Sequence, residues 1–196
     1  MLSVMAIQDH GVKPEDGPVL VTGAAGGVGS MAVMLLSKLG YQVTASTGRV
    51  KSSRDFLITL GASEVIDRNV FNDESKPLAA ERWAAVVDSV GAQPLASVLA
   101  QVKYEGLVAA CGLAAGMSLP TTVAPFILRG VTLRGIDSVM ASQPRRARAW
   151  AAMSNLIDSD LLATLYEVKP MSELPELGEQ ILAGQVKGRV VIDVNA

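Results

Sequence analysis

The sequence predicts an α/β fold in which a doubly wound parallel sheet of about six strands is flanked by helices. One observation is the alternation of short apolar runs with helical patterns over residues 19–111. The other is a glycine-rich turn between the first apolar run and the first long helical pattern, in Val19–Met31, which reads VLVTGAAGGVGSM. Strand, tight glycine turn and helix in this order open a dinucleotide-binding unit of the Rossmann type.

The composition indicates an ordinary globular protein. The chain has 196 residues, of which 49% are hydrophobic and 18% charged, and its net charge is −2. Such a chain can bury a substantial core, and its acidic balance predicts no nucleic-acid partner. No apolar run reaches the ~18 residues of a membrane span, so no membrane partner is expected. The first ten residues do not resemble a signal peptide and there is one cysteine, which predicts a cytoplasmic protein.

The elements are expected in a regular order. A helix that contains Leu2, Val4 and Ile7 should end near Gly11, and a polar linker follows from Lys13 to Pro18. The expected strands are Val19–Thr22, Gln42–Ser46, Glu64–Ile66, Ala84–Asp88, Gly106–Cys111, Val131–Ile136 and Gly188–Val194. The expected helices are Ser30–Leu39, Ser53–Leu60, a short one before Trp83, Pro94–Val102, Thr121–Arg129, Gln143–Ile157 and Leu174–Leu182, with a loop near Asn69–Lys76. Parallel crossovers are right-handed almost without exception, which leaves few topologies.

The glycine turn predicts a pyrophosphate site. Gly23, Gly26, Gly27 and Gly29 fall within seven positions. Glycines let such a turn close, let the backbone approach a pyrophosphate and let the helix pack tightly on the strand. Free N–H groups at the helix start, together with the positive end of the helix dipole, then hold the phosphates.

The end of the second strand predicts which dinucleotide is bound. An adenosine ribose with two free hydroxyls is usually met by an acidic residue about 20 residues after the glycine turn. Here no carboxylate occurs between Asp16 and Asp55, and residues 45–51 read ASTGRVK. The hydroxyls of Ser46 and Thr47, a turn at Gly48 and the cations Arg49 and Lys51 suit a ribose 2′-phosphate, which predicts NADPH. The alternative is that both cations belong to a solvated loop.

Two families of reductase fit the glycine pattern. Short-chain dehydrogenases need a Tyr-x-x-x-Lys pair, but the residues four positions after the three tyrosines are Ala45, Val108 and Pro170. A second set of motifs is spread over essentially the whole chain: Ala24-x-Gly26-x-x-Gly29, Leu39-Gly40-x-x-Val43, Ser46–Arg49, Leu60–Ala62, Trp83–Gly91, Val108–Leu113, Leu119–Arg129, Gly135–Met140 and Arg145–Trp150. With these motifs the chain resembles the medium-chain dehydrogenase/reductase superfamily in its zinc-free quinone-oxidoreductase-like branch, and within it the bacterial NADPH-dependent acryloyl-CoA reductases.

The resemblance implies a division of the chain into three parts. Family members begin with a GroES-like catalytic domain, which is missing here, so residues 1–17 are expected to be a helix and linker left from that junction. Residues 18–140 would form the NADPH-binding Rossmann core, and residues 141–196 would add C-terminal helices and a final strand packing on it. In the family this strand returns to the missing domain. Cys111 and His10 are the only cysteine and histidine, so a Cys₄ zinc site is excluded and we expect no metal.

The resemblance also assigns residues to the cofactor. Hydride from NADPH would reduce the C=C bond of an enoyl thioester. The resemblance implies that the following residues lie along the bound cofactor: Ala25, Gly26, Gly27, Val28, Ser89, Cys111, Gly112 and Leu113. Asp137 is expected near the nicotinamide carboxamide, with an exposed strand-end acid as the alternative, and Arg189 is expected to reach back toward NADPH. No catalytic residue is identified, because no side chain stands out as a general acid.

The resemblance also implies a homodimer and leaves more than one function to consider. Family members pair an edge strand across a twofold axis, so residues 132–137 are expected to form a homodimer. The substrate implied by the resemblance is a small molecule, namely an enoyl-CoA such as acryloyl-CoA, with a quinone as the alternative. A standalone or inactive NADPH-binding fragment is a further alternative of another class.

Overall fold

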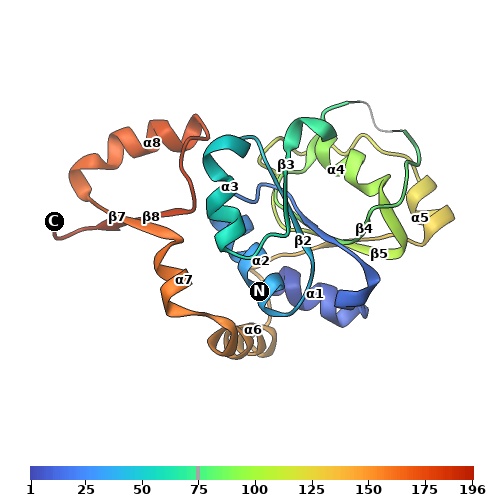
Figure 1. Cartoon of the computed structure of the whole chain (residues 1–196), viewed down its shortest axis with the longest axis horizontal. Helices are drawn as coiled ribbons and strands as arrows, with labels where there is room; N and C mark the ends of the chain where they lie inside the picture. Colours follow the sequence, from blue (N-terminus) through green and yellow to red (C-terminus); the bar gives the residue numbers. More distant parts are fainter. Residues whose placement is uncertain (74–75) are drawn as a thin grey trace.

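The main sheet has the predicted doubly wound topology. The computed structural model describes residues 1–73 and 76–196. Its six strands lie in the order β3-β2-β1-β4-β5-β6, and every neighbouring pair is parallel (Figure 1). The strands are β1 (Val19–Val21), β2 (Val43–Thr47), β3 (Glu64–Asp67), β4 (Trp83–Asp88), β5 (Val102–Ala110) and β6 (Thr132–Gly135).

Helices connect these strands and continue after them. They are α1 (Leu2–His10), α2 (Gly27–Lys38), α3 (Val50–Thr59), α4 (Ala92–Leu99), α5 (Ala124–Arg129), α6 (Gln143–Leu156), α7 (Ser159–Ala163) and α8 (Leu174–Leu182). Short 3₁₀ turns lie at η1 (Pro14–Asp16), η2 (Arg68–Phe71) and η3 (Met171–Glu173). Gly11 ends α1 in the left-handed conformation, as expected for a helix that stops at glycine.

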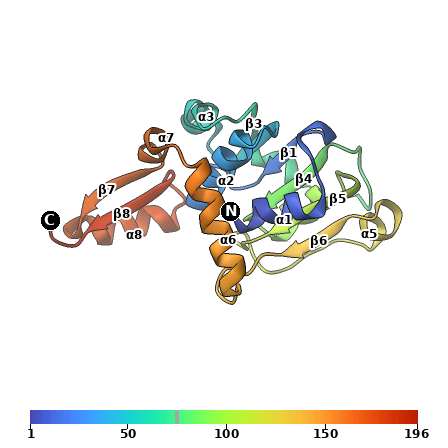
Figure 2. The same cartoon turned by 90° about the horizontal axis from the view of Figure 1, so that it is seen from below.

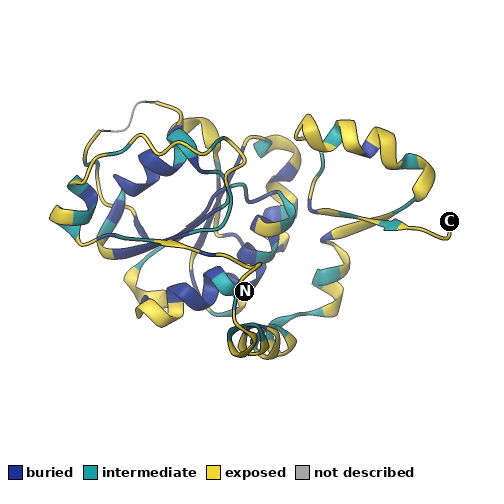
Figure 3. Ribbon diagram, turned by 180° about the vertical axis from the view of Figure 1, so that it is seen from behind, coloured by how far each residue is buried: buried dark blue, intermediate teal, exposed yellow. Residues whose placement is uncertain are grey.

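Each face of the sheet carries its own hydrophobic core. Val19 and Val21 of β1 belong to the core on the face of α1, α2 and α3, whereas Leu20 belongs to the other core, with Phe71 and Trp83. Successive side chains of a strand point to opposite faces, so apolar residues throughout a strand require cover on both sides. The central strands are accordingly buried along their length (Figure 3).

The short helix expected before Trp83 is wrong for the residues that the structure describes there. Residues 79–82 run beside the connection between α4 and β5. The N–H of Ala79 donates to the carbonyl of Ala100 at 2.8 Å, and the N–H of Arg82 donates to the carbonyl of Gln101 at 2.8 Å. Because these N–H groups bind carbonyls more than ten residues away, they are not available to a local helix.

A small second sheet lies beside the main one. Strands β7 (Tyr166–Pro170) and β8 (Arg189–Asp193) pair in parallel, and with η3 and α8 they form what we call the C-terminal lobe, residues 166–196. The lobe projects from the main sheet in two perpendicular views (Figures 1 and 2). The expected final strand, β8, thus pairs with β7. Neither β7 nor α7 was predicted from the sequence. The lobe meets the core through residues 184–189, where the N–H of Gly188 donates to the carbonyl of Ala25 at 2.9 Å.

Candidate nucleotide-binding site

The glycine turn lies where doubly wound sheets bind ligands. Strand order reverses between β1 and β4, and the crevice beyond the carboxyl ends of such strands is the usual ligand site. The turn from Thr22 to Gly26 leads directly into α2, whose first residue is Gly27, three residues earlier than expected. In helix geometry the first N–H groups have no intrahelical acceptor, so those of Gly27 and Val28 can donate to a ligand.

Two of the turn glycines are required by space. A Cβ atom added to Gly29 would lie 2.6 Å from the Cα of Ala24 and would also collide with the carbonyl oxygen of Gly23. Gly23 itself has a φ of 60° and would, with a side chain, meet the Ser89 hydroxyl at 2.5 Å. The helix can therefore pack against the turn only with hydrogen atoms at these positions. Ala25 is buried, Gly26 and Gly27 are partly exposed and Val28 is 52% exposed, so residues 26–28 form the accessible part of the turn.

A buried carboxylate holds the turn against β4. Thr22 Oγ1 donates to Asp88 Oδ1 at 2.6 Å, and the N–H of Gly91 donates to Asp88 Oδ2 at 2.8 Å. The N–H of Ser89 donates to Thr22 Oγ1 at 3.1 Å, and Ser89 Oγ donates to the Thr22 carbonyl at 3.0 Å. Burial raises the pKa of Asp88, while these hydrogen bonds oppose the shift. Sequence reasoning missed Thr22 and Asp88, although an acid at the end of an apolar strand was a usable signal.

The ends of β4 and β5 come together as expected. The N–H of Cys111 donates to the Asp88 carbonyl at 2.7 Å, and the Cys111 thiol lies 3.3 Å from the same oxygen. A Cβ added to Gly112 would lie 2.6 Å from the carbonyl oxygen of Ser89. Leu113 is 58% exposed beside this contact. Burial raises the pKa of the Cys111 thiol, so the residue fits a structural position and not that of a nucleophile.

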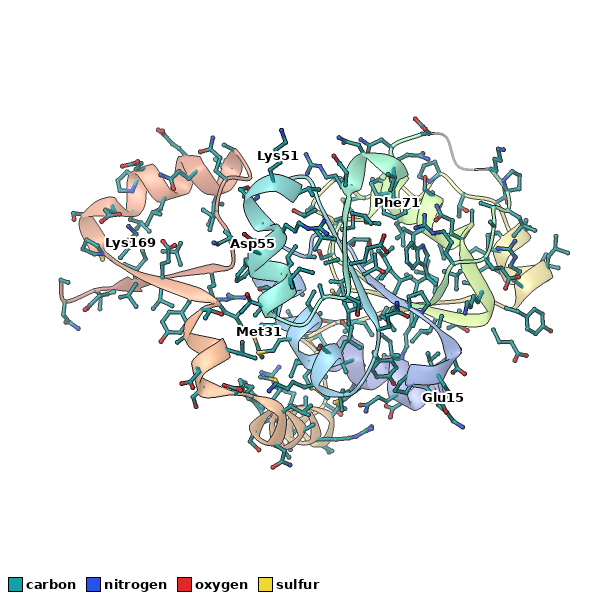
Figure 4. All side chains as sticks on the ribbon, in the orientation of Figure 1. Glu15, Met31, Lys51, Asp55, Phe71 and Lys169 are labelled. Carbon is teal, nitrogen blue, oxygen red and sulfur yellow. The ribbon has the colours of Figure 1, made fainter. Side chains whose placement is uncertain are left out.

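The end of β2 presents cations and no acid. Ser46 and Thr47 are buried, and Thr47 Oγ1 accepts from the N–H of Arg49 at 3.2 Å. Gly48 and Lys51 are exposed, and Lys51 lies at the first turn of α3 (Figure 4). The Arg49 guanidinium donates to the carbonyls of Gly184 and Val186, the latter at 2.9 Å. Arg49 therefore joins the β2 end to the segment that leads into β8.

Arg189 and Asp137 have different environments. A Cβ added to Gly27 would lie 2.9 Å from Nη2 of Arg189, so this guanidinium is placed at the start of α2 from the C-terminal lobe. Asp137 follows β6 and its Oδ1 accepts from the N–H groups of Val139, at 2.7 Å, and Met140, at 3.3 Å. These contacts show a turn-capping acid, and its approach to a nicotinamide stays a prediction.

The side chains that the structure describes do not suit a metal ion. No group of three or more His, Cys, Asp or Glu residues is placed to hold one within the described ranges. The two zinc-type ligands are far apart along β5. His10 Nε2 donates to the carbonyl of Glu105 at 2.9 Å, whereas Cys111 follows the last residue of that strand. These two residues therefore cannot share a zinc ion in the described part of the chain. Among the same residues, no helix has the length and apolar character needed to cross a membrane.

Comparisons with known proteins agree with this geometry. An acrylyl-CoA reductase, AcuI, of Ruegeria pomeroyi is 53% identical over 197 residues, which cover 100% of this chain and 59% of that protein. The putative quinone oxidoreductase YhfP of Bacillus subtilis is 46% identical over 97% of this chain and 58% of its own length. The chain thus spans about three-fifths of the length of these relatives.

A solved structure and a family model give the same assignment. The crystal structure of the YhdH oxidoreductase from Salmonella enterica in complex with NADP superposes with a TM-score of 0.95 at 49% identity, over 98% of this chain and 59% of that one. The model of a family described as zinc-binding dehydrogenase matches residues 27–158. That match spans well over half of the sequence, and the chain therefore belongs to the zinc-binding dehydrogenase family, within the medium-chain dehydrogenase/reductase superfamily.

Proposed function

We propose that this chain is the NADPH-binding part of an oxidoreductase that reduces the activated C=C bond of a short enoyl-CoA, acryloyl-CoA to propionyl-CoA. Two features together carry the proposal. The N-terminus of α2 follows a glycine-rich turn, and the end of β2 has the cations Arg49 and Lys51 and no acidic residue of its own. The relative named acrylyl-CoA reductase and the NADP complex of the Salmonella oxidoreductase support the same cofactor and substrate class. Bound NADPH would supply the hydride, and no step of the proposal passes through a metal.

The residues of the chain would bind and orient the cofactor. We assign the pyrophosphate to the backbone of Gly26, Gly27 and Val28, with the Arg189 guanidinium above Gly27. Ser89 and the Cys111–Leu113 turn would line the path from the pyrophosphate to the nicotinamide. The Rossmann core of residues 18–140 would carry most of these groups, and the C-terminal lobe would contribute Arg189.

Arg49 is assigned to the 2′-phosphate together with Lys51. Its guanidinium already faces two carbonyl oxygens, those of Gly184 and Val186. A phosphate is an anion, whereas a carbonyl group is neutral. Bidentate hydrogen bonds from Arg49 to a phosphate are therefore stronger than its hydrogen bonds to the two carbonyl oxygens. Cofactor binding would then exchange acceptors at Arg49 or add the phosphate beside them.

Two titrations test the cofactor assignment. NADPH and NADH are titrated into the 196-residue chain and followed by cofactor fluorescence, first with the unaltered protein and then with Arg49→Ala. We expect about a tenfold loss of NADPH affinity and little change for NADH. Arg54→Ala removes the same charge from an exposed position of α3 and serves as the control. Equal loss of both cofactors in Arg49→Ala would exclude a 2′-phosphate role.

Turnover assays distinguish the candidate substrates. NADPH oxidation is measured with acryloyl-CoA and, in parallel, with a quinone, which is the second candidate because the 46% identical YhfP is named a putative quinone oxidoreductase. Acryloyl-CoA turnover supports the main proposal and quinone turnover alone supports the second. NADPH binding with neither activity identifies a binding module without catalysis, since the chain covers only 59% of its 53% identical relative.

We further propose a cytoplasmic homodimer paired through residues 132–137. β6 is the last strand of the main sheet, and an unpaired edge readily adds a second strand. Ile127 of α5 and Met140 lie close by in sequence and are 73% and 82% exposed. Light scattering should give twice the chain mass of 20.5 kDa, and a single-chain mass at all concentrations would contradict the pairing.

A further inference from the structure

Three arginines from two elements gather around one carboxylate of α1. Arg148 of α6 donates to both oxygens of Asp9, at 2.9 Å to Oδ2 and 2.6 Å to Oδ1, and these bonds are the main reason that the pKa of Asp9 is low. Arg134 of β6 and Arg145 of α6 lie close enough to lower the same pKa further. α6 packs beside α1 (Figure 2). We call Arg134, Arg145 and Arg148 the arginine cluster.

The arginine cluster has more positive charge than Asp9 can balance. Within residues 1–73 and 76–196, the side chains of Arg134 and Arg145 make no hydrogen bond and no ion pair. Arg134 is exposed and Arg145 is partly exposed. The carboxylate of Asp137, which follows β6, is occupied by the N–H groups of its own turn. Two guanidinium groups of the cluster are therefore available to an anion from outside the chain.

The arginine cluster is connected to the carboxyl end of β6 by an exposed apolar segment. Val139 and Met140 follow that strand and are each 82% exposed. Arg146, which precedes the cluster's Ala147 and Arg148 in α6, donates from Nη1 to the carbonyl of Ser138 at 2.8 Å and so ties the first turn of α6 to this segment. A long ligand that begins at the carboxyl ends of the strands would pass the apolar segment before it reached the arginines.

We propose that the arginine cluster binds the phosphate groups of a coenzyme A thioester substrate, with Val139 and Met140 beside the pantetheine arm. The proposal rests on the proposed reduction of an enoyl-CoA and adds a substrate site to it. Coenzyme A has a diphosphate and a 3′-phosphate, and a phosphate monoester alone carries a charge of about −1.5 to −2 at pH 7. Guanidinium groups bind such oxygens through paired, charge-assisted hydrogen bonds. A quinone has no anionic group for these arginines, so the cluster favours the thioester as the substrate class.

The test compares five forms of the 196-residue chain. Arg145→Ala and Arg148→Ala each remove one guanidinium of the cluster, whereas Asp9→Asn removes the acid and leaves every arginine in place. Arg54→Ala removes an equal charge from the exposed part of α3 and is the matched control. Coenzyme A is titrated calorimetrically into each form and into the unaltered chain, with saturating NADPH and a thiol reductant present. Circular dichroism shows whether each form is folded, and NADPH binding is measured separately by fluorescence.

The expected changes have opposite signs for the arginines and the acid. Arg145→Ala and Arg148→Ala should each weaken coenzyme A binding about tenfold, the low end for charge-assisted hydrogen bonds because the site is exposed. Asp9→Asn should tighten it by up to about fivefold, since Arg148 loses its competing partner and an exposed ion pair is worth no more than that. Arg54→Ala should leave it unchanged, and all forms should bind NADPH equally. Added salt should reduce these differences.

The outcomes separate this inference from the function on which it rests. If the unaltered chain binds NADPH but no coenzyme A, or if folded Arg145→Ala and Arg148→Ala bind coenzyme A as the unaltered chain does, the role of the cluster is refuted and the NADPH assignment stands. Weaker coenzyme A binding in Asp9→Asn, or an equal loss in Arg54→Ala, would also refute it, because the effect would not follow the charge of the cluster. An unaltered chain that does not bind NADPH overturns the proposed function itself.

Discussion

Gly29 offers a direct test of the packing between α2 and the turn. Replacing Gly29 by Ala adds a methyl group 2.6 Å from the Cα of Ala24 and 2.8 Å from the carbonyl carbon of Gly23. Ordinary carbon–carbon contacts are about 3.5–4.0 Å, so the overlap with these backbone atoms of the turn is about 1 Å. Neither neighbour is a flexible side chain, and α2 or the β1 turn must move.

The expected cost is set by two opposing terms. Overpacking of a tight interior site costs about 1–3 kcal/mol, whereas alanine is favoured over glycine in a helix by about 1 kcal/mol. The difference between the two terms is about 0–2 kcal/mol. Because the overlap is with backbone atoms, Gly29→Ala should lower the free energy of unfolding, by up to about 2 kcal/mol. Gly178 in α8 has no atom within 4 Å of an added Cβ, so Gly178→Ala keeps the propensity gain without the overlap. The two substitutions should differ in sign.

Urea unfolding followed by circular dichroism measures both effects, and hydrogen exchange in α8 reports the local gain from Gly178→Ala. NADPH titration of Gly29→Ala should also show weaker binding, since displacement of α2 moves the N–H groups of residues 27 and 28. The reasoning is refuted if Gly29→Ala stabilises the chain as Gly178→Ala does, because the helix would then have room for a side chain.

Three further predictions concern titratable groups. Burial raises the pKa of Asp88 above its ordinary 3.8, so the folded chain binds this proton more tightly and stability falls as pH rises through that window. Asp88→Asn should flatten the fall in melting temperature that begins as the pH rises above the ordinary pKa of Asp88. If the pH profiles of the two proteins ran parallel, the result would contradict this prediction. Burial also raises the pKa of Cys111, so iodoacetamide should label it much more slowly than the unfolded chain at about pH 7.5 and faster as pH rises. Equal rates in the folded and unfolded chains would show that Cys111 is accessible and that burial does not raise its pKa. Arg148 binds both oxygens of Asp9, at 2.9 and 2.6 Å, and holds the pKa of Asp9 low. Arg148→Ala should lower the melting temperature only slightly, and the difference should vanish in high salt or as Asp9 is protonated in acid; a large, salt-independent loss would show a packing role.

The main sheet was predictable because its signals are local. Apolar runs bounded by glycines, separated by helical patterns, define strands β1 to β6 to within about four residues. The glycine turn was predictable for the same reason, since Gly23 to Gly29 are neighbours in the sequence. The C-terminal lobe was harder, because β7 has no strong alternation and is defined by its pairing with β8.

The misassigned segment before Trp83 shows the limit of local patterns. Its N–H groups donate to carbonyl groups in the connection between α4 and β5. The local sequence of residues 77–82 gives no information about those distant acceptors. Helical propensity in a short segment is a weak preference that a few tertiary hydrogen bonds override.

The sequence by itself determined the fold class, the glycine turn and the absence of an acid at the end of β2, because each depends on residues close together in the chain. Only the tertiary structure decided what surrounds them. Strand register placed Arg68 against Gly48, burial joined Thr22 to Asp88, and the path of residues 184–189 brought the Gly184 and Val186 carbonyls to Arg49. These contacts link residues between 20 and 137 positions apart, and no local pattern records such separations.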